Sequence, residues 1–186
     1  MASVLGMVGC GRDEIRTYEV PKSQAKAETP AAPTTGEFRI LGAMYPPEEP
    51  TWFFKIVGPS AAIEPHLKSF DDFLASLRFP DPKGPPAYDL PAGWASTGPK
   101  SIHADTIAIG TGPQALELTI TPAMGGVNSN LKRWAVDQLG MPASVMSNTA
   151  QFSKTVPTKG GTKVLRVDLT GPNNPAGSRP RMMGGK

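Results

Sequence analysis

At residues 51–79 the chain reads TWFFKIVGPSAAIEPHLKSFDDFLASLRF, a strand pattern followed directly by a helix pattern. Trp52, Phe54 and Ile56 alternate with the residues between them, and this period of two places all three on one face of a β-strand. Beyond a Gly-Pro pair, apolar residues recur at steps of three and four, the spacing of one helix face. They are Ile63, Leu67, Phe70, Leu74 and Leu77. We expect the strand face and the helix stripe to cover each other in the core.

The limits of this helix are predicted from its flanking residues. Ser60 is a candidate N-cap, and Pro65 suits the first turn, where an amide donor has no partner to lose. Regular turns are therefore expected from about Glu64. The helix should end near Phe79, because Pro80 disfavours helical geometry in the residue before it.

Composition predicts one domain with polar flanks. The chain has 186 residues, of which 20 are glycine and 21 proline, and many of these lie outside residues 37–170. We expect a polar spacer at 11–36, a single α+β domain at 37–170 and a Gly/Pro/Arg tail at 171–186. The net charge of +3 is small, and no expected element carries a basic run with interleaved aromatics. Nucleic acid is therefore not an expected partner.

The rest of the chain predicts further strands and one more helix. A helix is expected at residues 129–139, capped by Asn128 or Asn130. Further strands are expected at residues 15–20, 38–45, 102–109, 115–121, 151–156 and 163–169. Residues 88–94, with Leu90, Pro91 and Gly93, open the second half of the domain. The fold class is thus α+β, a largely antiparallel sheet covered by two α-helices.

The first ten residues predict a lipoprotein-type leader. They are apolar or small up to Cys10, the single cysteine, and polar sequence follows at once. Residues 7–10, MVGC, resemble a bacterial lipobox, in which the cysteine is lipidated and becomes the mature N-terminus. Met7 replaces the usual leucine and the leader lacks a basic region, which a start codon upstream of Met1 would explain. The alternative is an inert cysteine near the terminus.

No catalytic, metal-binding or cofactor-binding residues are predicted. Residues 110–115, GTGPQA, match a dinucleotide fingerprint, but a strand rather than a helix follows, so a hairpin turn is expected. His66 and His103 have no second ligand at metal spacing and are expected to be solvated or hydrogen-bonded. Asp71 and Asp72 are adjacent on a helix and point in different directions.

Aromatic residues supply the candidate binding surface. If Trp52 and Phe54 face the helix, Phe53 faces the opposite way, and an aromatic exposed on a sheet can mark a contact site. Tyr45 and Trp94 are the other candidates for this surface. The alternative for all three is a place in the core.

Five segments carry a resemblance to a known family. They are TWFFKIVGP (51–59), SFDDFLASLRF (69–79), LPAGW (90–94), NLKRWAVDQLGM (130–141) and KVLRVDLTGP (163–172). Together they resemble a family of secreted or lipid-anchored planctomycete proteins, which has no activity to carry over. LPAGW and the TWFFK strand are also loosely similar to the start and end of PsbP and Mog1-like domains, although here they stand in the opposite order. The photosystem and GTPase-binding roles of those domains are not transferred.

Two functions follow as hypotheses. The first is a non-enzymatic envelope lipoprotein, anchored to the membrane by a lipid on Cys10, whose domain binds a protein or a small apolar ligand. The second is an envelope hydrolase with an unidentified site. An enzyme should have a cleft of convergent polar groups with perturbed ionisation, and a binding module an exposed apolar patch or open sheet edge.

Overall fold

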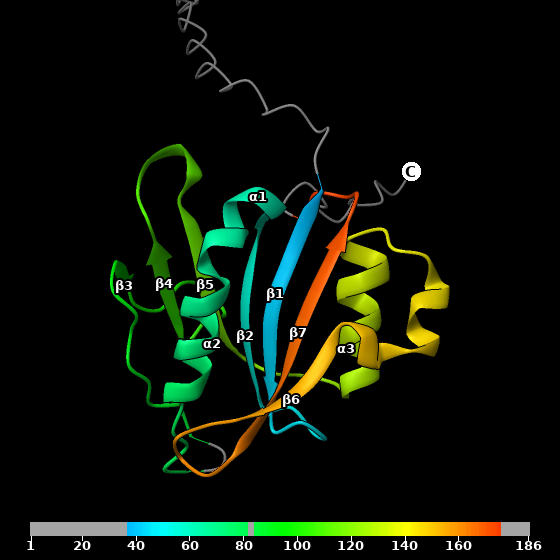
Figure 1. Cartoon of the computed structure of the whole chain (residues 1–186). Helices are drawn as coiled ribbons and strands as arrows, with labels where there is room; N and C mark the ends of the chain where they lie inside the picture. The colour runs from blue at the N-terminus through cyan, green and yellow to red at the C-terminus, as the bar shows by residue number, and fades with distance from the viewer. Residues whose placement is uncertain (1–36, 82–83, 176–186) are drawn as a thin grey trace, which may run out of the picture. The chain divides into compact units, whose positions relative to one another are not determined.

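Seven strands form one antiparallel sheet in the computed structural model, which describes residues 37–81 and 84–175 (Figure 1). The order across the sheet is β3-β4-β5-β2-β1-β7-β6. The strands are β1 (Phe38–Tyr45), β2 (Trp52–Pro59), β3 (Trp94–Ser96), β4 (Asp105–Ile109), β5 (Leu116–Pro122), β6 (Ser153–Pro157) and β7 (Lys163–Gly171). With helices on both faces, the α+β prediction is confirmed. Cys10, the leader, the spacer, the strand expected at 15–20 and most of the tail lie outside the described residues.

The strand and helix of residues 51–79 form the predicted core layer. Trp52, Phe54 and Ile56 of β2 are buried in a cluster with Phe70 and Leu74 of the helical segment. β2 lies between β1 and β5, and its pairing with β1 runs from Tyr45↔Trp52 to Phe38↔Pro59. This first cluster occupies one face of the sheet, the face crossed by α1 and α2 in Figure 1.

The helical segment differs from its predicted limits. It consists of α1 (Ser60–Ile63), a 3₁₀ turn (Glu64–His66) and α2 (Leu67–Ser76). Ser60 makes no side-chain cap; its N–H donates to the Glu37 carbonyl at 2.8 Å. The helix ends at Ser76, three residues before Phe79, because the chain turns extended at Leu77. Arg78 then pairs with Ala87 across the following loop.

The second helix covers the opposite face of the sheet. It begins as α3 (Val127–Lys132) and continues as a π-helical segment (Arg133–Gln138). Leu131 and Trp134 pack in a second cluster with the alternate side chains of the central strands, such as Phe53. The predicted caps were wrong, because Gly126 is the N-cap and no side chain caps this helix.

The remaining elements follow the predicted hairpins with shifted limits. Residues 110–115 form the turn between β4 and β5, in which Gly110 and Gly112 have positive φ, so the hairpin interpretation is confirmed. Residues 88–94, which open the second half of the domain, lead into β3, which begins at Trp94. β6 and β7 form the last predicted hairpin.

The two ends of the described sheet are neighbours. Phe38, the first residue of β1, pairs with Gly171, the last residue of β7.

No helix among residues 37–81 and 84–175 is long and apolar enough to cross a membrane.

Candidate functional site

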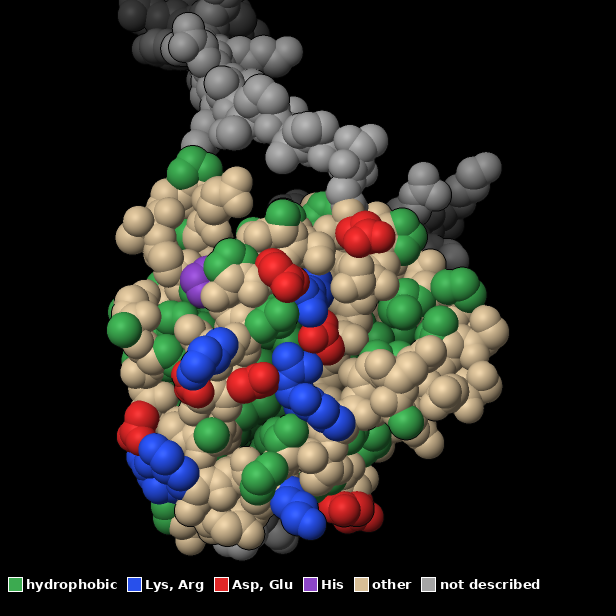
Figure 2. Space-filling view, viewed as in Figure 1, with side chains coloured by type: hydrophobic (Ala, Val, Ile, Leu, Met, Phe, Trp, Pro, Cys, Tyr) green, Lys and Arg blue, Asp and Glu red, His purple; other side chains and the backbone are tan. Residues whose placement is uncertain are grey.

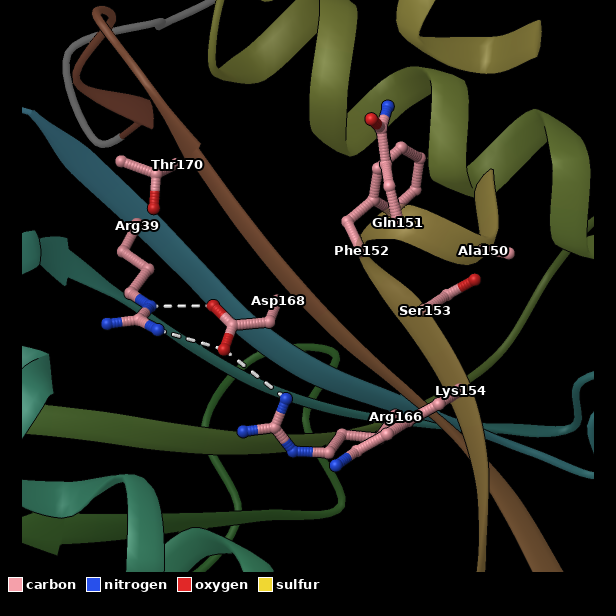
Figure 3. Close-up of a pocket in the computed structure, with 9 residues that line it drawn as sticks. All are labelled: Arg39, Ala150, Gln151, Phe152, Ser153, Lys154, Arg166, Asp168 and Thr170. Carbon is pink, nitrogen blue, oxygen red and sulfur yellow. Dashed lines mark hydrogen bonds and ion pairs between the residues drawn. The ribbon is translucent and has the colours of Figure 1, made fainter. Parts of the chain in front are cut away.

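The largest network of ion pairs among the described residues lines an open pocket on the face that carries α2. Its volume is about 400 Å³, and we call it the arginine pocket (Figure 3). It is formed by side chains of β1, β7, β6 and the 3₁₀ turn before β6. Its lining residues include Arg39, Gln151, Ser153, Arg166, Asp168 and Thr170.

Asp168 holds both arginines of this pocket in place. Arg39 donates from Nε and Nη2 to the two carboxylate oxygens of Asp168, at 2.6 and 2.9 Å. Arg166 donates from Nη1 to Asp168 Oδ2 at 3.3 Å. Such a bidentate arginine–carboxylate pair fixes the orientation of the arginine side chain and is stronger than a single hydrogen bond. The three side chains come from β1 and β7, which pair through the register Arg39↔Thr170.

Two carboxylates from the helical segment complete the network. Arg39 also pairs with Glu64 of the 3₁₀ turn, and Arg166 donates from Nε to Asp71 of α2 at 2.6 Å. Figure 2 shows the resulting line of alternating red and blue side chains across this face. The network therefore ties the helical segment to β1 and β7.

The electrostatics of the network favour its charged form. Burial by itself raises the pKa of Asp168, but the hydrogen bond and charge of Arg39, together with Arg166, hold that pKa below its ordinary value. The Asp168 hydrogen bond in turn raises the pKa of Arg39. Two arginines face three carboxylates, so the arginine pocket offers donors and acceptors already held in position.

A smaller pocket lies on the opposite face, beside the π-helical segment. Its volume is about 210 Å³, and we call it the lysine pocket. The lining side chains come from β2, β5, the loop before β4 and the π-helical segment. They are Phe53, Lys55, Ile102, His103, Thr119, Thr121, Arg133, Trp134 and Gln138.

Lys55 is the distinctive group of the lysine pocket. Its Nζ lies 5.5 Å from the centre of the Trp134 ring and donates to Gln138 Oε1 at 3.4 Å. Burial, followed by repulsion from Arg133, lowers the pKa of Lys55 to about 8. Within residues 37–81 and 84–175, no carboxylate forms an ion pair with this amine.

The predicted aromatic surface lies in the core. Tyr45, Phe53 and Trp94 are each only 7% exposed. Phe53 does face away from Trp52, as predicted, but the second helix covers it and Trp134 meets it edge-on. Tyr45 stacks on Phe79, and Trp94 packs in the first cluster. The three side chains are therefore buried and do not form an exposed binding surface.

The other sequence candidates fall in separate places. His103 lines the lysine pocket, and its Nδ1 lies 2.7 Å from Thr121 Oγ1. His66 meets the Trp94 ring edge-on. Asp71 belongs to the arginine network, whereas Asp72 pairs with Lys68 on the exposed helix face. Among the described residues, no group of three His, Cys, Asp or Glu side chains could hold a metal ion.

Sequence reasoning missed the charged residues of both pockets. Arg39 and Asp168 are 129 residues apart, and no local sequence pattern predicts that they form a pair. Lys55 did leave a signal, because it is the one charged residue in the aromatic run TWFFKIV. Comparisons with family models, curated proteins and solved structures find no match for this chain.

Proposed function

We propose that this chain is a non-enzymatic binding module of the cell envelope, tethered by a lipid on Cys10, which holds a polar ligand at the arginine pocket. The observation that supports binding is the position of Asp168, which orders Arg39 and Arg166 in advance of any ligand. Groups ordered beforehand lose less conformational entropy on binding. The lipobox-like MVGC segment and the resemblance to lipid-anchored proteins support the tether.

The tether is tested by metabolic labelling. The native chain and its Cys10→Ser variant are expressed in a bacterium with radioactive palmitate, with an upstream leader restored before Met1. We expect label in the native chain and none in Cys10→Ser. Absence of label from the native chain would remove the anchor from the proposal.

Ligand binding is tested separately, with the full chain carrying Cys10→Ser so that lipid cannot mediate it. Co-sedimentation with purified envelope fragments is measured for this protein and for Gln151→Trp, which places a bulky side chain at an exposed position of the arginine pocket. We expect the bound fraction to fall several-fold. Gln114→Trp, the same change at an exposed site in the β4–β5 turn, should bind normally. Equal binding by both variants would contradict the proposal.

An envelope hydrolase remains the second candidate, and the lysine pocket favours it. An amine whose pKa lies near 8 is partly neutral at physiological pH, as a general base or nucleophile requires. A hydrolase would release soluble products from envelope fragments, and Lys55→Met would abolish the release. The binding module predicts retention of the fragments without products.

A further inference from the structure

Within the described part of the chain, the positive charge of Lys55 in the lysine pocket has no carboxylate paired with it. Lys55 is half-buried on β2, and Arg133 adds a second positive charge close enough to disfavour its ionisation. Cations removed from water are normally paired, because an unpaired buried charge costs free energy. The Trp134 ring and the Gln138 amide oxygen compensate only in part. An anionic ligand would neutralise the positive charge of Lys55 and Arg133.

The groups that face Lys55 can be named for each neighbouring element. The π-helical segment contributes Arg133, Trp134 and Gln138, the loop before β4 contributes His103, and β5 contributes Thr119. The acid on this side of β5, Glu117, is already paired with Lys100 at 2.5 Å. The described lining of the lysine pocket thus holds cations, hydroxyls and an amide, and no carboxylate.

The backbone beside the pocket is also unusual. Residues Arg133–Gln138 form a π-helical segment, in which the Leu139 N–H donates to the Trp134 carbonyl at 3.1 Å, five residues back. Segments of this kind are rare and occur frequently at functional sites. Three of the lining side chains come from this segment.

We propose that the lysine pocket binds a small organic carboxylate, with the carboxylate group at Lys55 and Arg133 and the apolar part against Ile102. The apolar part follows from Ile102, which lines the pocket and is 72% exposed, so that a ligand could cover it. The volume of about 210 Å³ lies below the roughly 300 Å³ at which pockets for drug-sized ligands begin, which restricts the ligand to a small molecule. This site is on the opposite face from the arginine pocket and does not depend on the function proposed there.

The test measures benzoate binding to the full chain by NMR titration, with benzyl alcohol as the neutral analogue of similar shape. We expect benzoate to shift the amide signals of His103, Thr119 and Thr121, with a Kd on the order of 1 mM. Benzyl alcohol should leave them unchanged. Equal binding of the two compounds, no binding of benzoate, or tighter binding of inorganic phosphate at equal ionic strength would overturn the proposal.

Variants locate the site. Lys55→Met nearly keeps the length of the side chain and removes its charge, and Arg133→Gln removes the charge at an exposed helix position with a shorter polar side chain. Each should weaken benzoate binding about tenfold or more, the usual effect of losing a charged hydrogen-bond partner. Lys132→Gln removes the same charge one residue away, outside the pocket, and should bind benzoate normally. Normal binding by Lys55→Met would overturn the proposal.

Benzoate affinity measured against pH in the unmodified chain tests Lys55 without a substitution, so a folding defect in a variant cannot explain the result. Because Lys55 loses its proton as the pH rises through about 8, benzoate affinity should fall about fivefold or more between pH 7 and pH 9.5. The fall should persist in His103→Gln and disappear in Lys55→Met. An affinity that stays constant across this range would overturn the role of Lys55.

Discussion

Gly42, in the middle of β1, shows how closely the second helix approaches the sheet. A Cβ atom at this position would lie 2.8 Å from Trp134 Cζ3 and 3.2 Å from the Phe54 carbonyl oxygen. Because overpacking forces such neighbours apart, Gly42→Ala should lower the free energy of unfolding by about 1–3 kcal/mol. Urea denaturation followed by circular dichroism measures this change.

The same substitution in a Trp134→Phe background serves as its control. The shorter ring lacks the atom that the new methyl group would meet, so the effect of Gly42→Ala should be markedly smaller there. An equal loss in both backgrounds would show that the clash with Trp134 is not the cause.

The Asn130 side chain holds the loop that leads into α3 through hydrogen bonds to its backbone. Its side-chain amide is buried and donates to the carbonyl oxygens of Met124, Gly125 and Gly126, at 3.0, 3.2 and 2.9 Å. Asn130→Ala leaves these carbonyls without that donor and should cost about 1–3 kcal/mol of stability in thermal or urea unfolding. Asn128→Ala, at an exposed position two residues earlier, should be close to neutral. Similar losses of stability in both variants would show that these hydrogen bonds do not stabilise the loop.

For single residues, the sequence predicts which face of a strand a side chain occupies, but not whether that side chain is exposed. Alternation predicted that Trp52 and Phe54 share a face and that Phe53 takes the other, and both statements are correct. Exposure of Phe53 was not predictable from the strand itself, because it depends on which face the second helix crosses. The same holds for Asn130, which the sequence suggested as a cap and which instead bonds backwards to the loop.

At the scale of elements, the arginine network joins β1 and β7 to the helical segment. The pKa of Asp168 is lower in the folded state than the value of about 3.9 in an unfolded chain. Its contribution to stability is therefore complete above about pH 4 and is lost as the pH falls through the folded pKa. We expect Asp168→Asn to be less stable than the native chain at pH 7 and to lose less additional stability between pH 5 and pH 2.

Asp72→Asn is the matched control for this pH dependence. Asp72 makes an exposed pair with Lys68, and exposed pairs contribute only about 0–1 kcal/mol. Its variant should follow the native unfolding curve at every pH. If Asp168→Asn also followed the native curve, the network would have no measurable role in stability.

Local signals predicted the elements better than their ends. The hairpins were foreseeable because alternation and turn residues lie within a few positions of each other, as at residues 110–115. The helix limits were not, since Pro80 suggested an end near Phe79 while Leu77–Phe79 turn extended to meet the chain near Ala87. That pairing and the arginine network are tertiary contacts, which local propensity does not contain.

On the scale of the whole molecule, the central strands belong to two hydrophobic clusters at once. Adjacent residues of β2, Phe53 and Phe54, lie in the clusters on opposite faces of the sheet. Because the same strands support both clusters, the described domain should unfold in one cooperative transition. Phe53→Ala and Phe54→Ala should each cost about 3–5 kcal/mol and lower the same transition.

Tryptophan fluorescence can follow the two clusters separately. A variant retaining only Trp134 reports on the cluster beside the π-helical segment, and one retaining only Trp52 reports on the cluster beside α2. In the Phe53→Ala background, the fluorescence midpoint of each reporter in urea should coincide with the circular dichroism midpoint of the same variant. A fluorescence midpoint that differs from the circular dichroism midpoint of the same variant would mean that each face unfolds by itself.

The pairing of Phe38 with Gly171 means that the described domain begins and ends at one place. Directly opposed residues of antiparallel strands have Cα atoms only about 5 Å apart. A few added residues could therefore close residues 37–175 into a ring, and the ring could be reopened at the β4–β5 turn to give a circularly permuted protein. For the same reason, this domain could be inserted as a cassette into a surface loop of another protein without separating the ends of that loop.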